Sequence, residues 1–328
     1  MSEELGPAPL PVHVAQPSAP RRRGRFWSVF VQNRLAVSGL AVLGLIVLAS
    51  VVGPLLSPSH PDALDVANRF ATPSLAHPMG TDELGRDVMT RVLAGGRLSL
   101  VVGGLATLVA LAIGITVGAT AGARPGWLDN VLMRLVDLAL SLPDLFLLIL
   151  ITSLLGPSVM TIVIVISIVR WMNVARLVRA SFLSLREQEF VEAARATGAG
   201  QLRIVLGHLL PNSLSPVIVA GTLGVASAII AESTLSFLGL GVQPPASSWG
   251  SMLRAAQSQM FTSPWLALFP GAMIFLTVIS INFVGDGLRD AVDPATIRVP
   301  RGTRRILDEL VAEKRPTVPN PRQTGEQA

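Results

Sequence analysis

Residues 98–123 read LSLVVGGLATLVALAIGITVGATAGA and contain no charged side chain. As an α-helix rising 1.5 Å per residue, this run of 26 residues is about 39 Å long. The hydrocarbon core of a bilayer is roughly 30 Å thick, so the run is long enough to cross it. The stretch therefore predicts a helix embedded in a membrane.

Five further apolar runs lie on either side of this stretch. Three of them carry no charge: Leu35–Ser59, Asn212–Ala231 and Trp265–Gly285. The other two are less regular: Leu138–Leu155, interrupted by Asp144, and Ser158–Val169, which needs Trp171–Ala175 to reach spanning length. Gly156-Pro157 separates these two and predicts a turn between helices. We therefore predict an all-α polytopic membrane protein with six transmembrane helices.

The composition of the whole chain supports this class. Charged residues make up 14% of the 328 residues, half of the residues are hydrophobic, and the mean hydropathy is +0.57. Soluble domains carry roughly 25% charged residues, and a soluble chain this apolar would expose large hydrophobic patches. The absence of cysteine excludes a disulfide framework, and four histidines argue against a multi-histidine metal site. We predict no metal site.

The basic residues predict the orientation in the membrane. With the N-terminus inside, 21 of the 26 Lys and Arg residues fall in the predicted inner segments, and six spans return the C-terminus to the same side. This bias follows the positive-inside rule. Both termini are therefore expected to be cytoplasmic, and the net charge of +5 requires no nucleic-acid partner.

Spans and charges divide the chain into four segments. We predict a disordered, basic and proline-rich cytoplasmic tail over residues 1–30, the first span and an outer loop over 31–97, a transmembrane core over 98–290, and a second cytoplasmic tail over 291–328. The second tail contains a stripe that suits either one amphipathic helix or a solvated segment: Ile306, Leu307, Leu310 and Val311.

The outer loop contains two acid-to-base pairs at helical spacing. Asp82 precedes Arg86 and Asp87 precedes Arg91 by four residues each, which favours a helix. We interpret this segment as an ordered cap over the spans, in preference to a direct ligand contact.

A long inner loop over about 184–211 predicts a helical hairpin on the cytoplasmic face. Ser184 and Glu187 have the spacing of a capping box, and Gly198 and Gly200 are expected to end the helix that follows. A second short apolar stripe would then end at Pro211. The small residues of the first helix leave room for another surface, so the hairpin is predicted to be a docking element.

Three acidic residues lie close to or within the spans, where ionisable groups are functional candidates. Asp137 follows Arg134 by three residues, which favours a local ion pair. Asp144 lies deeper and follows Pro143, which is expected to kink its helix, so both are candidates for lining a path across the membrane, should the chain form one. Glu232 is a path candidate too, although we favour a structural role in orienting the loop that follows it.

Gly114, Gly118 and Gly122 recur at four-residue spacing in the second span. Such a stripe predicts a close-packing face for another helix. The spacing does not identify that helix.

The hairpin also carries a signature. It reads Glu192-Ala193-Ala194, then three residues and Gly198, then nine residues and His208-Leu209-Leu210-Pro211. This pattern resembles the EAA signature of permease subunits of ABC importers, with His208 at a usually aliphatic position, as looks usual for the peptide-permease branch. Three more segments resemble the second permease of dipeptide, oligopeptide and nickel importers: His77–Arg97, Leu235–Pro245 with Trp249-Gly250, and Gly285–Asp290 with Asp293-Pro294.

The resemblance implies a type I ABC importer permease fold in the bacterial plasma (inner) membrane. It implies a second homologous permease, two cytoplasmic ATPases and an extracytoplasmic solute-binding protein as partners, with di- or oligopeptides as the solute. ATP and Mg²⁺ would be bound by the ATPases, and this chain would bind no cofactor. The residues implied in ATPase coupling are Glu192, Ala193, Ala194, Gly198, Leu210 and Pro211.

Other classes of function fit less well. The chain has no glycine-rich phosphate loop, and its one lysine is Lys314, so it is not expected to hydrolyse ATP. A membrane-embedded enzyme would need motifs that are missing here. An ion-coupled secondary carrier would need acids near the midplane, where only Asp144 qualifies, and nickel or another small solute remains open as the cargo.

Overall fold

The computed structural model describes residues 22–57 and 60–292. Within these ranges the structure is helical, and the one β-bridge joins Thr81 to Asp87. Five helices in these two ranges are long and apolar enough to cross a membrane. They are α2 (Arg34–Leu56), α3 (Val88–Ala123), α6 (Val159–Leu185), the continuous helix Gln201–Phe237 that contains α8 (Gln201–Ile204) and α9 (Leu210–Phe237), and α11 (Trp265–Val292).

The remaining predicted span is a broken one. It consists of α4 (Trp127–Leu140) and α5 (Asp144–Leu155), which meet at an angle of 89°, so the count is six only if this pair is one span. The kink expected at Pro143 is in fact a complete break. Proline has no N–H to donate and disfavours helical geometry in the residue before it, so α4 ends and Pro143 becomes the N-cap residue of α5. Gly156, with φ of +83°, then makes the predicted turn into α6.

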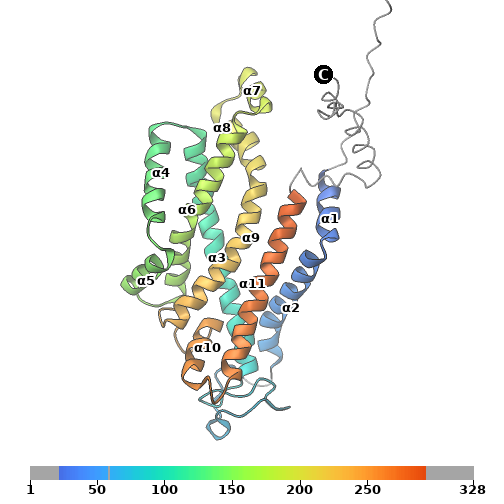
Figure 1. Ribbon diagram of the computed structural model, residues 1–328, viewed down its shortest axis with the longest axis vertical. Coiled ribbons are helices and arrows are strands. Elements are labelled where there is room, and N and C mark those ends of the chain that lie inside the picture. The colour runs from blue at the N-terminus through green and yellow to red at the C-terminus, as the bar shows by residue number, and fades with distance from the viewer. Residues whose placement is uncertain (1–21, 58–59, 293–328) are drawn as a thin grey trace, which may run out of the picture. The chain divides into compact units, whose positions relative to one another are not determined.

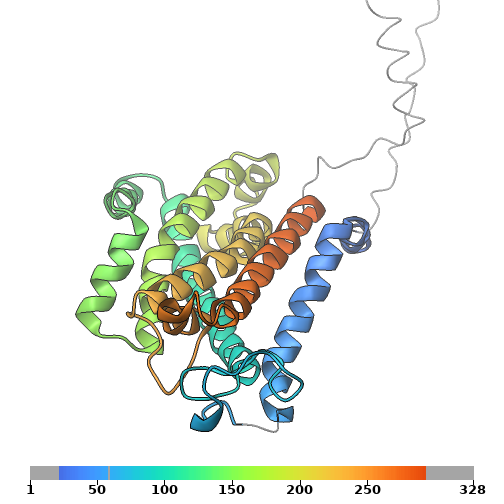
Figure 2. The ribbon, with the colours of Figure 1, turned by 60° about the horizontal axis from the view of Figure 1, so that its bottom comes forward.

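Helix α3 is the central element and packs against α2, α6 and α9 (Figures 1 and 2). The glycine stripe faces α6: a Cβ added to Gly114 or Gly118 would lie 2.5 Å from an atom of Val174 or Ala175. The predicted close-packing face is therefore confirmed, and its partner is α6. Glycine lets the two backbones approach each other closely without a side chain between them.

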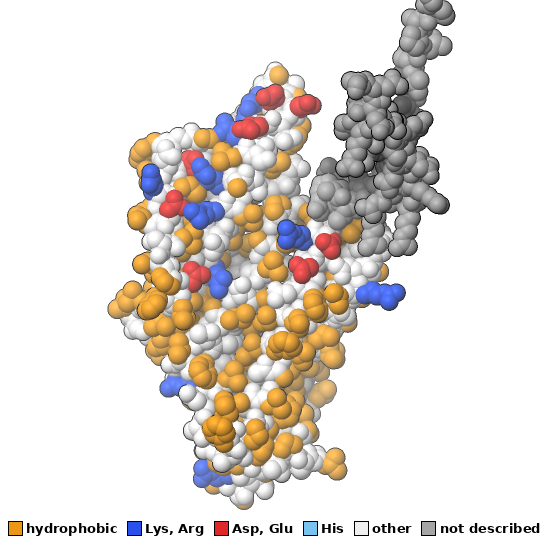
Figure 3. Space-filling view, in the orientation of Figure 1, with side chains coloured by type: hydrophobic (Ala, Val, Ile, Leu, Met, Phe, Trp, Pro, Cys, Tyr) orange, Lys and Arg blue, Asp and Glu red, His pale blue; other side chains and the backbone are white. Residues whose placement is uncertain are grey.

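The described helices run between two ends (Figure 1). One end carries α1 (Arg22–Gln32), the turn from α3 to α4, and α7 (Glu189–Ala196) with α8. The opposite end carries α10 (Trp249–Ala256) and the irregular loop over residues 60–87. Hydrophobic side chains cover the lower middle of the face drawn in Figure 3, whereas charged side chains gather toward the end that carries α7. This distribution is what a bilayer around the middle requires.

The N-terminal segment differs from its prediction. Helix α1 begins at Arg22, inside the range 1–30 that we expected to be a disordered tail. Phe30 is buried with Ala36 and Val284, so it holds α1 against α2 and α11. Residues 1–21 and 293–328, with the predicted tails and the stripe from Ile306 to Val311, lie outside the described residues.

Candidate functional site

The hairpin helix α7 begins later than predicted. Ser184 lies in the last turn of α6, which continues to Leu185 because that side chain packs against the apolar cluster at this end. Helix α7 then starts after Gln188, which makes no side-chain capping bond. The prediction that Ser184 and Glu187 form a capping box for α7 is therefore wrong.

The end of α7 follows the prediction. Gly198 has φ of +80°, in the left-handed region that favours glycine. Its N–H donates to the carbonyl of Arg195 at 2.9 Å, and the N–H of Ala199 donates to the carbonyl of Ala194 at 3.0 Å. These two bonds form a Schellman motif, which satisfies carbonyl groups left over at a helix end.

One side of α7 is anchored in the protein. Val191 is fully buried, in an apolar cluster whose other buried members come from α6 and from the continuous helix Gln201–Phe237: Val178, Phe182, Ile204, Leu209 and Val217. Partly buried Ala119 and Ala123 of α3 pack against the same cluster, and the side-chain amide of Gln201, the first residue of α8, donates to the carbonyl of Ala123 at 2.9 Å. A displacement of α7 therefore acts through this cluster on the ends of three long helices.

The other side of α7 is exposed. Glu189, Glu192 and Ala193 are exposed, and Ala194 is half-buried. Phe190 is 41% exposed, and its ring centroid lies 6.3 Å from that of His208. This surface combines carboxylates, an aromatic ring and a short side chain that permits close approach of another backbone.

Pro211 does not end the second stripe. Leu210 and Pro211 open α9, and residues 201–237 form one continuous helix with a π-helical turn over Val205–Leu209. Proline clashes with the carbonyl of an earlier turn in a regular helix, and the wider π turn just before Pro211 gives room for its ring. The hairpin therefore passes directly into a long apolar helix.

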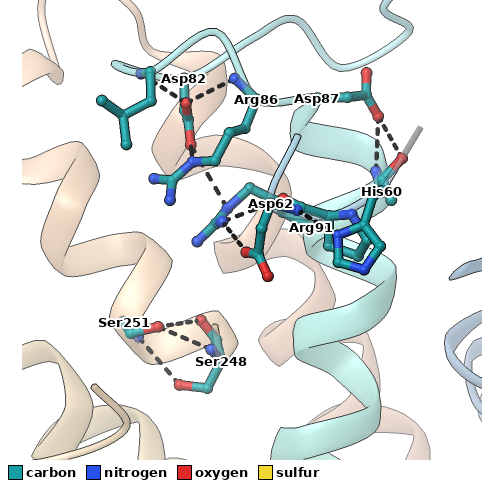
Figure 4. A network of polar contacts seen from close by, with 11 residues as sticks. His60, Asp62, Asp82, Arg86, Asp87, Arg91, Ser248 and Ser251 are labelled. Carbon is teal, nitrogen blue, oxygen red and sulfur yellow. Dashed lines mark hydrogen bonds and ion pairs between the residues drawn. The ribbon is translucent and has the colours of Figure 1, made fainter. Parts of the chain in front are cut away.

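The outer loop is ordered by ion pairs, without the predicted helix (Figure 4). Asp82 accepts a hydrogen bond from Nε of Arg86 at 2.7 Å and from two backbone N–H groups, which closes a tight turn. Arg91 contacts Asp62 at 3.3 Å and Asp82 at 3.6 Å, not Asp87. The i,i+4 spacing therefore predicted the ion pair of Asp82 with Arg86 correctly, and the pair of Asp87 with Arg91 wrongly.

Asp87 has a structural role at the start of α3. Its carboxylate accepts hydrogen bonds from the N–H and the hydroxyl of Thr90, both at 2.8 Å. Its other oxygen lies 3.1 Å from Nδ1 of His77. Asp87 therefore caps α3 and fixes the loop to it.

Glu232 is fully buried in a network of hydroxyl groups. It accepts hydrogen bonds from Ser236 at 2.7 Å and Ser99 at 3.1 Å. The backbone N–H groups of Val242 and Trp249 donate to the same two serines. The carboxylate thus connects α3, α9, α10 and the loop over residues 238–248 between α9 and α10, which supports the structural role that we favoured.

The other two acidic candidates differ from each other. Asp137 forms an ion pair at 2.5 Å with Arg176 of α6 rather than with Arg134. Asp144 is half-buried in the first turn of α5, and among residues 22–57 and 60–292 its carboxylate makes no hydrogen bond or ion pair. Its place on the path stays a prediction, as does that of Pro143.

Arg170 is the residue that sequence reasoning missed. It was counted among the basic residues of the inner side, yet it lies in the middle of α6 and lines a cavity between α3, α6 and α9. The signal was available, because Arg170 interrupts the apolar run that begins at Ser158.

The fold and the hairpin define a class of protein, and comparison with known families identifies it. Residues 114–298 match the binding-protein-dependent transport system inner membrane component family, and residues 22–76 match the N-terminal transmembrane domain of oligopeptide transport permease C. The chain belongs to this family of membrane permeases.

Individual relatives extend over most of the chain. A putative peptide permease protein of Brucella suis is 45% identical over 267 residues, which cover 81% of this chain and 88% of the relative. The oligopeptide transport system permease protein of Escherichia coli K12 is 44% identical over the same shares. The dipeptide transport system permease protein of Bacillus subtilis is 41% identical over 82% of this chain and 84% of its own length. The resemblance stated from the sequence is confirmed.

Proposed function

We propose that this chain is a permease subunit of an ATP-driven importer of dipeptides or oligopeptides. The relatives named above are described as peptide, dipeptide and oligopeptide permeases, and each aligns with more than four-fifths of this chain. The chain forms the translocation path together with a second, homologous permease.

The proposed topology has six crossings, with α4 and α5 as one broken span and both termini in the cytoplasm. Its support is the charge bias, with 20 of the 26 basic residues on the proposed inner side once Arg170, which lies within α6, is left out. The end that carries α7 then faces the cytoplasm, and the loop over residues 60–87 with α10 faces outward, where a solute-binding protein delivers the peptide. The transmembrane core extends over about residues 98–290.

Two ATPase subunits bind at the cytoplasmic end and supply the energy. They hold ATP and Mg²⁺, because this chain has no phosphate-binding loop, and the chain itself binds no cofactor. The single observation that carries this proposal is the geometry of α7, an exposed acidic surface fixed to the core through fully buried Val191.

The coupling mechanism follows from that geometry. A groove on the ATPase surface receives the exposed side of α7 around Glu192 and Ala193. When ATP closes the ATPase dimer, the groove displaces α7, and the cluster around Val191 passes the movement to α6 and α9. Packed helices then rotate as rigid bodies between inward-open and outward-open states.

The experiment is transport by the assembled complex in proteoliposomes carrying Glu192→Arg. A reversed charge in the groove should reduce peptide uptake at least tenfold, since an uncompensated buried charge costs several kcal/mol. The control is Asp286→Arg. Asp286 is an exposed acid of α11 at the end of the molecule that carries α7, and its substitution should leave uptake unchanged. Unchanged uptake in Glu192→Arg would contradict the docking role.

A further inference from the structure

Arg170 places a full positive charge at membrane depth. It lies 11 residues after the start of α6 at Val159, which is about 17 Å along the helix axis. A hydrocarbon core of roughly 30 Å therefore has Arg170 near its middle. Charges at that depth are costly and face the interior of the bundle or a cavity.

A cavity of about 190 Å³ lies beside Arg170. Its polar lining comes from three helices: Thr107 of α3, Arg170 and Asn173 of α6, and Ser227 of α9. Gly221 and Gly224 of α9 line it too, and a Cβ added to them would lie 2.8 Å from Leu111 and 3.1 Å from Thr107 of α3, respectively.

The guanidinium has unused donors. Nη2 of Arg170 donates to the carbonyl of Ser227 at 3.4 Å, a long contact, and Nε is buried with no hydrogen-bond partner. Within residues 22–57 and 60–292, no carboxylate lies within ion-pair distance of Arg170. A buried donor without a partner is expensive, so its retention calls for an anionic group that this chain does not supply.

The chemistry of the site indicates that group. Guanidinium presents a planar fork that binds a carboxylate through two parallel hydrogen bonds. Sites that enclose a whole small molecule measure roughly 300–1,000 Å³, so this cavity suits one end group of a larger solute.

We propose that Arg170, with Asn173 and Ser227, forms a subsite for the C-terminal carboxylate of the peptide in transit. This inference rests on the proposed function, because it takes the solute to be a peptide. The subsite would hold the peptide end midway through the membrane and give the path a preference for free acids.

The test uses the absence of cysteine from this chain. A single cysteine at Ala220→Cys, which lines the cavity but is not part of the proposed subsite, is placed in the assembled complex, and the rate at which a small maleimide labels it is measured with dialanine or with dialanine amide. The same cysteine is combined with Arg170→Gln and, as a control, with Arg134→Gln, which removes an exposed arginine of α4.

In the chain that carries the cysteine alone, and in the Arg134→Gln control, we expect the free acid to slow labelling severalfold more than the amide does. This difference should vanish in Arg170→Gln. Equal protection by acid and amide would overturn the subsite, as would a difference that persists in Arg170→Gln. Protection by neither compound, the outcome if an acid of the second permease occupies the guanidinium, would also overturn it. Peptide uptake by the unmodified complex is measured separately, and its absence would instead contradict the peptide substrate.

Discussion

Gly198 shows how one backbone angle shapes the proposed coupling site. Its φ of +80° costs a residue with a Cβ about 1 kcal/mol or more, and no atom lies within 4 Å of the position where that Cβ would stand. We expect Gly198→Val to loosen the end of α7 and to lower the ratio of peptide transported to ATP hydrolysed in the assembled complex.

Gly200 is the matched control for this prediction. It also has open space around its missing Cβ, but its φ is −65°, which any residue adopts. Gly200→Val should therefore keep the wild-type coupling ratio. Equal effects of the two substitutions would show that bulk, and not the left-handed geometry of Gly198, is what matters.

A second prediction at the residue scale concerns the substitution of Glu232. Glu232→Ala removes the acceptor for Ser99 and Ser236 and leaves a cavity, so the free energy of unfolding should fall by about 2–4 kcal/mol. Glu232→Gln keeps an acceptor oxygen and should cost clearly less. Thermal unfolding of the purified chain in detergent measures both, and an equal loss in the two variants would contradict the role of the acceptor.

Single residues could be predicted from the sequence where the chemistry is local. Gly198 was found as a helix end because left-handed geometry depends on neighbouring residues alone. The ion-pair partners of Arg91 and Asp137 were wrong because each is fixed by tertiary packing, against the loop at Asp62 and against Arg176 of α6. Arg170 was misplaced because a residue count assigns a side to a charge without asking which helix it belongs to.

At the scale of elements, the close contact between α3 and α6 predicts that a larger side chain at Gly118 lowers the stability of the protein. A Cβ at Gly118 would lie 2.5 Å from the carbonyl oxygen of Ala175 and 2.8 Å from the Cβ of Val178. Gly118→Val should therefore separate the helices and cost about 1–3 kcal/mol or more in unfolding free energy. The unfolding temperature in detergent measures this loss.

Gly104 provides the control on the same helix. No atom lies within 4 Å of its missing Cβ, so Gly104→Ala should leave the unfolding temperature unchanged or raise it slightly, because alanine favours helix over glycine. A similar loss in both variants would mean that the effect belongs to α3 itself and not to its contact with α6.

The spans could be predicted as elements because a charge inside the hydrocarbon core has a direct physical cost, so that runs of about 20 residues without charge mark the crossings. Their ends could not. Helix α6 continues past Ser184 because Phe182 and Leu185 pack into the cluster around Val191. The residues around Pro143 form a break of 89° rather than a kink, since nothing in a local pattern states how far a chain turns when its helix stops.

At the scale of the whole molecule, charge placement and structure point to the same arrangement. The end that carries α7 is the one that the basic residues predict to be cytoplasmic, and it lies opposite the ion-paired loop around Asp82 and Arg91 (Figures 1 and 4). The prediction of sidedness rests on the sum of many weakly informative charges, so it can be made from the sequence. The ATPase contact that we propose for α7 was already predicted from its signature, but which side of α7 is buried and which is exposed is defined only by the folded chain.

The central claim is that α7 is the point where ATP-driven motion enters this chain, and cross-linking tests it most directly. Ala193→Cys, on the exposed side of α7, is compared with Leu75→Cys, which is fully exposed in the outer loop. With a short bifunctional maleimide in the assembled complex, Ala193→Cys should form a covalent adduct with an ATPase subunit, and Leu75→Cys should not. Absence of an ATPase adduct from Ala193→Cys, with an adduct formed from Leu75→Cys, would contradict both the docking role and the orientation.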